Sequence, residues 1–133
     1  MSEVRGVVVA HGDLAAALVA TVERISGLGG ALRAVSNEGL GPDRLREVLR
    51  EAMGSDPSIL FVDLASGSCG IAGLGLSQER GEVVVLTGTN VPMLLDFVFH
   101  RDLPLEELTA RLRDKARAGI RAHGCAPDPP EGS

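Results

Sequence analysis

Aromatic residues are scarce in this sequence, which has no tryptophan, no tyrosine and only three phenylalanines among 133 residues. Positive charge is also limited, because 13 lysines and arginines stand against 18 aspartates and glutamates, for a formal net charge of -5. Nucleic-acid-binding proteins rely on basic surfaces and often on aromatic side chains that stack on bases. The composition therefore argues against a nucleic-acid partner. It also argues against a sugar site, since such sites often use the faces of Trp or Tyr.

Cysteine and long apolar runs are scarce as well. Cys69 and Cys125 are too few and too far apart for a disulfide framework or a CxxC metal site, so we expect two free thiols in a reducing compartment. The N-terminal apolar run is short and leads at once into His-Gly-Asp, which fits neither a signal peptide nor a transmembrane helix. We therefore expect a soluble, cytoplasmic protein with no segment inserted into the membrane.

Short β-branched runs alternate along the chain with segments of helical periodicity. Such alternation predicts an α/β fold, with a doubly wound, mainly parallel four-stranded sheet in the order 2-1-3-4 and helices on both faces. The length suits a single domain, which we place at residues 1–123, followed by a flexible Pro-rich tail at 124–133. The predicted strands are residues 4–10, 31–36, 59–63 and 82–87, and the predicted helices are residues 14–26, 42–53, 66–77, 91–99 and 104–118.

Two titratable residues stand where predicted strands end. Ligands of doubly wound sheets gather at the carboxyl ends of the strands, and His11 and Asp63 occupy two such ends. If the first and third strands are neighbours, the Asp63 carboxylate can hold one ring nitrogen of His11 and leave the other as a nucleophile. The alternatives are an inert histidine at a strand end and a helix N-cap at Asp63.

The segment after Asp63 offers groups suited to an anion. Ser66, Gly67 and Ser68 supply hydroxyls and an unhindered backbone at a predicted helix N-terminus, where free N–H groups favour negative charge. Without Walker spacing, plain helix capping is the alternative for this segment. We assign Asp13 to capping of the first helix. No metal site is predicted, because no second histidine stands at ligand spacing from His11.

Three separated segments together resemble one family, the mannose-type enzyme IIA component of the bacterial phosphoenolpyruvate-dependent sugar phosphotransferase system. They are "GVVVAHGDLAAALVATVERISG", "ILFVDLASGSCGIA" and "VVLTGTNVPMLLDFVF". The second is similar to the family's "DLFGGSP" loop and the third to its "GvNLPML" segment. Within the loop, Ala65 and Ser66 replace the family's Phe and first Gly, and Cys69 replaces its Pro.

The resemblance implies a phosphotransferase component that works as a phosphohistidine carrier. His11 would accept a phosphoryl group from the histidine-containing phosphocarrier protein and pass it to an enzyme IIB partner, for sugar uptake or regulation. Asp63 would orient His11, and Ser68 falls at the serine of the family's loop. The family implies a homodimer without cofactor or metal. It also allows an extra C-terminal edge strand exchanged between subunits, although the chain after Ile120 is short and Pro-rich here.

Other functions remain open at this stage. His11 phosphorylation could act as a regulatory switch without sugar transport. A His-Gly metal chelatase would need a second metal-binding residue facing His11. The Arg-His-Gly phosphatases and mutases fit less well, because Ala10 stands where their anion-clamping arginine would be.

Overall fold

A computed structural model describes residues 3–130, so the end of the predicted tail, residues 131–133, lies outside the described residues. Its centre is one sheet of four parallel strands in the order β2-β1-β3-β4. The strands are β1 (Arg5–Ala10), β2 (Leu32–Ser36), β3 (Ser58–Val62) and β4 (Val83–Leu86). The predicted α/β class, parallel sheet and strand order are confirmed.

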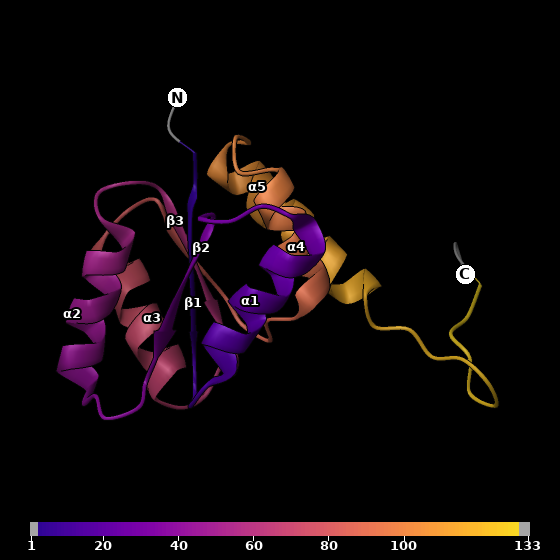
Figure 1. The fold of residues 1–133 in the computed structure, drawn as a ribbon, viewed down its shortest axis with the longest axis horizontal. Helices are drawn as coiled ribbons and strands as arrows, with labels where there is room; N and C mark the ends of the chain where they lie inside the picture. Colours follow the sequence, from indigo (N-terminus) through magenta and orange to yellow (C-terminus); the bar gives the residue numbers. More distant parts are fainter. Residues whose placement is uncertain (1–2, 131–133) are drawn as a thin grey trace.

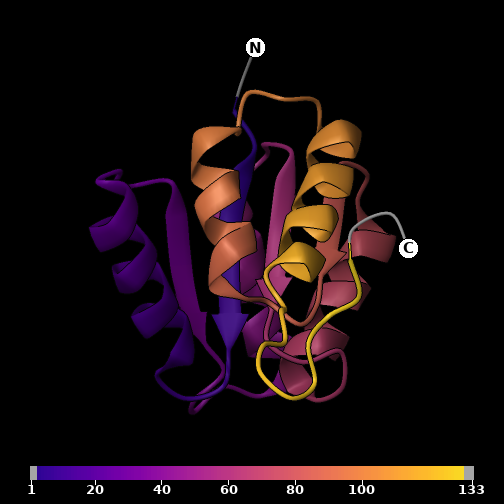
Figure 2. The ribbon, with the colours of Figure 1, turned by 90° about the vertical axis from the view of Figure 1, so that its right-hand side faces the viewer.

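Helices cover both faces of the sheet, as predicted (Figures 1 and 2). One face carries α1 (Leu14–Ser26), α4 (Val91–Phe99) and α5 (Leu105–Ala118), and the other carries α2 (Pro42–Met53) and α3 (Ser68–Glu79). Up to Pro130 no strand follows α5, so the extra edge strand is absent from the part of the chain that the structure describes. None of the helices in residues 3–130 is long and apolar enough to span a membrane.

The sheet separates two apolar cores, which explains the continuous hydrophobic runs of its central strands. All five residues of β3 are buried, as are five of the six residues of β1, because helices cover these strands on both sides. On the α1, α4 and α5 side, the rings of Phe61 and Phe97 meet edge to face with their centroids 5.1 Å apart. Gly6 makes room for this pair, since a Cβ there would lie 2.5 Å from Cε2 of Phe97.

Glycines let α3 pack closely on the other side. A Cβ at Gly70 would collide with the carbonyl oxygen of Ala65, and one at Gly73 would touch the Val85 side chain at 3.5 Å. The start of α3 therefore lies tightly against its preceding loop and the sheet. Because Ala10 pairs with Ser36 and Val9 pairs with Val62, the loops after β1, β2 and β3 meet at one edge.

Candidate functional site

The turn after β1 presents His11 at the carboxyl edge of the sheet, with its side chain 43% exposed. Gly12 follows with φ +58°, a left-handed conformation that glycine adopts without strain and that turns the chain into α1. The loop after β2 holds this turn in place. The Ser36 hydroxyl donates to the Gly12 carbonyl at 2.8 Å, and the Gly12 N–H donates to Oδ1 of Asn37 at 3.3 Å.

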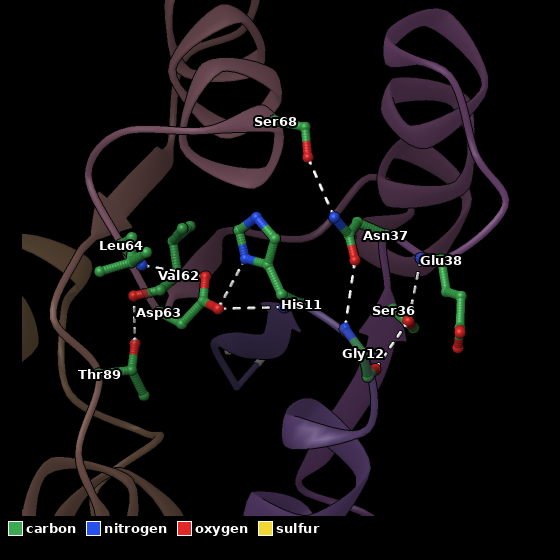
Figure 3. A network of polar contacts seen from close by, with 10 residues as sticks. All are labelled: His11, Gly12, Ser36, Asn37, Glu38, Val62, Asp63, Leu64, Ser68 and Thr89. Carbon is green, nitrogen blue, oxygen red and sulfur yellow. Dashed lines mark hydrogen bonds and ion pairs between the residues drawn. The ribbon is translucent and has the colours of Figure 1, made fainter.

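Asp63 lies directly against His11, at the end of the neighbouring strand (Figure 3). Its Oδ2 lies 2.8 Å from the ring Nδ1 and accepts a hydrogen bond from the His11 backbone N–H at 3.0 Å. The other oxygen accepts from the Leu64 N–H at 3.0 Å. Asp63 is not the N-cap of α3, because that helix begins five residues later at Ser68. The structure thus brings together the two residues that the sequence placed at separate strand ends.

Two opposing effects act on the Asp63 carboxyl. Burial is the largest and raises its pKa, but the hydrogen bonds and charge of His11, together with the Leu64 N–H, outweigh it and leave the pKa below the ordinary 3.8. The group is therefore an ionised carboxylate at neutral pH. Since a carboxylate only accepts hydrogen bonds, it favours the His11 tautomer with its proton on Nδ1 and its lone pair on Nε2.

The start of α3 faces the same ring. Gly67, the N-cap residue with φ +95°, lies so near that a Cβ there would be 3.4 Å from both Cε1 and Nε2 of His11. Ser68 opens the helix, and its hydroxyl oxygen accepts from Nδ2 of Asn37 at 3.2 Å. Ser66 lies in the exposed loop before them. The first N–H groups of a helix have no intrahelical partner, so this end of α3 favours an anion.

Two residues of the site were not among the predicted site residues. Asn37 connects the His11 turn to the start of α3 through Gly12 and Ser68, and its only signal was its place directly after a strand. Cys69 is a buried free thiol whose sulfur lies within 4.8 Å of ligand atoms of both His11 and Asp63. Burial raises the pKa of this thiol, and the Asp63 charge raises it further. No sequence spacing connected Cys69 with His11.

Other sequence assignments had mixed outcomes. Asp13 stands at the N-cap of α1, as predicted, but its side chain makes no capping hydrogen bond. Cys69 and Cys125 are both free, as predicted.

The sequence matches the family model described as the PTS system fructose IIA component, EIIA-man, over residues 6–112 of its 133. The chain belongs to this family. The predicted resemblance is thereby confirmed, and the protein is an enzyme IIA component of the phosphotransferase system. A phosphotransferase role in that system follows from membership, and the family implies interaction with phosphocarrier and IIB partners.

Solved structures share the fold of this IIA component at low sequence identity. The phosphotransferase component EIIA of Streptococcus agalactiae is 22% identical with a TM-score of 0.82, and the alignment covers 88% of this chain and 95% of that one. The mannose/sorbose-specific IIA subunit of Enterococcus faecalis is 22% identical with a TM-score of 0.78, over 99% and 100% of the two chains. A sigma-54 interaction domain protein of Enterococcus faecalis is 19% identical with a TM-score of 0.73, over 89% and 93%. No curated protein matches the sequence.

Proposed function

We propose that this IIA component is a phosphohistidine carrier in which His11 accepts the phosphoryl group. The donor is the histidine-containing phosphocarrier protein, and the acceptor is an enzyme IIB protein or domain. The observation that carries the proposal is the contact of 2.8 Å between His11 Nδ1 and Asp63 Oδ2. This contact occupies one ring nitrogen and leaves Nε2 on the side of the ring that faces Gly67.

The transfer is an in-line exchange between two histidine nitrogens. The Nε2 lone pair of neutral His11 attacks phosphorus, and the bond from phosphorus to the donor nitrogen breaks, returning its electron pair to the donor ring. His11 keeps its Nδ1 proton and becomes a cationic phosphoimidazole ring. The ionised Asp63 carboxylate stabilises this cation and holds the ring in the attacking orientation.

The start of α3 supplies the surroundings for the phosphoryl oxygens. The Ser66 and Ser68 hydroxyls and the backbone of Gly67 are our proposed phosphate-binding groups, assisted by the free N–H groups of the helix N-terminus. Donor and product are both phosphohistidines, so the exchange needs no nucleotide, cofactor or metal ion.

The carrier acts between proteins and does not hold the sugar itself. We assign the carrier domain to residues 1–123 and treat 124–133 as a flexible tail. We further propose that the protein is a cytoplasmic homodimer that contributes to sugar uptake.

A regulatory role is the second candidate, in which His11 phosphorylation switches a protein contact and no sugar is imported. The observation behind this candidate is that the sigma-54 interaction domain protein of Enterococcus faecalis shares this fold. The two roles differ at the second transfer. A transport component passes its phosphate to an enzyme IIB, whereas a pure switch does not.

Labelling with phosphoenolpyruvate tests the proposal. Incubation with enzyme I and the phosphocarrier protein should add one acid-labile phosphate, and nitrogen NMR should place it on Nε2 of His11. His11→Gln should abolish the label, and the matched control His123→Gln, at an exposed position after α5, should keep it. An unlabelled wild type, or equal labelling of His11→Gln, would overturn the proposal. Addition of enzyme IIB to the labelled protein then separates transport from switching.

A further inference from the structure

Cys69 gives the site a chemical capacity that phosphoryl transfer does not use. Its sulfur, a ring nitrogen of His11 and a carboxylate oxygen of Asp63 all lie within 4.8 Å of one another. These residues come from three segments: the turn after β1, the end of β3 and the first turn of α3. Among residues 3–130, this is the group of three potential metal ligands that the fold brings together.

The donor set is selective for a particular class of ion. Imidazole nitrogen, thiolate sulfur and carboxylate oxygen are the three ligand types of protein-bound zinc, whereas calcium and magnesium prefer oxygen alone. In a tetrahedral zinc site, neighbouring ligand atoms lie about 3.3–3.6 Å apart, given the usual metal–ligand distances. Ligand atoms already within 4.8 Å reach that spacing through side-chain movements of about 1 Å.

Hydrogen bonds and packing hold the three side chains near these positions. The Asp63 carboxylate is fixed by the N–H groups of His11 and Leu64. The helix turn that carries Cys69 is fixed by the close approach of Gly70 to the Ala65 carbonyl. These contacts limit the rearrangement that metal binding requires to small side-chain movements, which favours binding. The partial exposure of His11 gives the ion access from solvent.

We propose that His11, Asp63 and Cys69 bind one zinc ion, and that this ion and the phosphoryl group exclude each other. Three protein ligands leave the fourth tetrahedral position to water. On binding, Cys69 releases its thiol proton to solvent, the Asp63 carboxylate is already ionised, and His11 binds as the neutral ring. The two negative charges then balance the ion, so the loaded site is neutral.

The exclusion follows from the shared histidine. A zinc bond to Nε2 occupies the attacking lone pair, and a zinc bond to Nδ1 moves the ring proton to Nε2, which removes that lone pair. In both cases Asp63 no longer holds Nδ1, so zinc-loaded protein cannot accept phosphate. This consequence, unlike the binding itself, rests on the proposed function. The zinc-loaded protein would therefore take no part in phosphoryl transfer.

Cobalt binding tests the site without any activity assay. Cobalt(II) takes the place of zinc in such sites, and its bond to a thiolate gives a charge-transfer absorption band. We expect this band at one equivalent of cobalt in the wild-type protein and its loss on addition of zinc. Cys69→Ser should abolish the band and weaken zinc binding at least about tenfold, the loss seen when even a supporting group is removed.

Cys125→Ser is the matched control, because it removes the other, exposed free thiol. It should leave the band unchanged. The absence of a band in the folded wild type, or its loss in Cys125→Ser with retention in Cys69→Ser, would overturn the metal site. Circular dichroism establishes that each variant is folded, and Cys69→Ala provides a second substitution if Cys69→Ser does not fold.

Phosphorylation measured with and without zinc tests the exclusion. In the wild type, zinc should lower the rate of His11 labelling. In Cys69→Ser, measured with the same phosphocarrier and enzyme I, the ratio of the labelling rates with and without zinc should stay near one. Equal zinc inhibition of both proteins would contradict the exclusion. If zinc-free wild type takes no label, the proposal of a phosphohistidine carrier is refuted. The cobalt experiment still tests the metal site independently.

Discussion

One carboxylate oxygen of Asp63 holds both the ring and the backbone of His11, at 2.8 Å from Nδ1 and 3.0 Å from the backbone nitrogen. The two residues are 52 positions apart in the sequence and end adjacent parallel strands. A single side chain thereby sets the position, the orientation and the favoured tautomer of the histidine.

Replacement of Asp63 by Asn should slow phosphoryl transfer to His11 by at least about tenfold, because the variant loses the carboxylate that orients the reacting histidine and stabilises its cation. The neutral amide no longer stabilises the cationic phosphorylated ring and no longer dictates the tautomer. Initial rates of labelling by the phosphocarrier measure the effect. Asp13→Asn is the control, because Asp13 makes no capping bond and its substitution should leave the rate unchanged. A wild-type rate in Asp63→Asn would remove Asp63 from the mechanism.

The same carboxyl should make folding stability depend on acid pH. Its pKa in the folded protein is lowered from 3.8, so its contribution is present above about pH 4 and is lost as pH falls through the lower folded value. The difference in free energy of unfolding between wild type and Asp63→Asn should therefore be constant near neutrality and shrink below about pH 4. Urea denaturation followed by circular dichroism at several pH values measures it. A difference that grows in acid would mean that the folded pKa is raised instead.

Asn37→Ala should cost about 1–2 kcal/mol of stability, because it removes the acceptor for the Gly12 N–H and the donor to the Ser68 hydroxyl. It should also slow labelling of His11, since the β1 turn and the start of α3 lose their connection. Urea denaturation and initial rates give the two effects. Glu38→Ala, at the next position in the same exposed loop, serves as the control. If both variants behave alike, Asn37 does not organise the site.

Gly6→Ala should destabilise the protein by about 1–3 kcal/mol through overpacking of the core. The added Cβ would lie 2.5 Å from the Phe97 ring and 2.8 Å from the Leu32 side chain. Gly81→Ala is the matched control, because a Cβ there has no neighbour within 4 Å and the backbone is not left-handed. Thermal unfolding of both variants checks the difference. Equal melting temperatures would show that the neighbouring core side chains move enough to accommodate the methyl group added at Gly6.

Local patterns predicted the elements well, and the exceptions have physical reasons. The helix predicted at 91–99 is observed as Val91–Phe99, where Pro92 and the capping side chain of Asn90 mark its start. The helix predicted at 66–77 is observed as Ser68–Glu79, because Gly67 adopts φ +95° and the loop must first pass the His11 ring. Asp13 takes the predicted N-cap position without a side-chain capping bond, since a residue type suited to an N-cap does not ensure that its side chain turns toward the helix.

Local patterns along the chain were enough to predict the alternation of strands and helices, the strand order expected of that pattern, and the two strand ends that carry His11 and Asp63. These features depend on local periodicity and on general rules of chain connection. The folded chain alone shows that Asn37 connects the His11 turn to Ser68 and that Cys69 lies beside the histidine. Such contacts depend on strand register and on how closely α3 approaches the sheet. Both are set by packing between segments far apart in the chain, which no local pattern records.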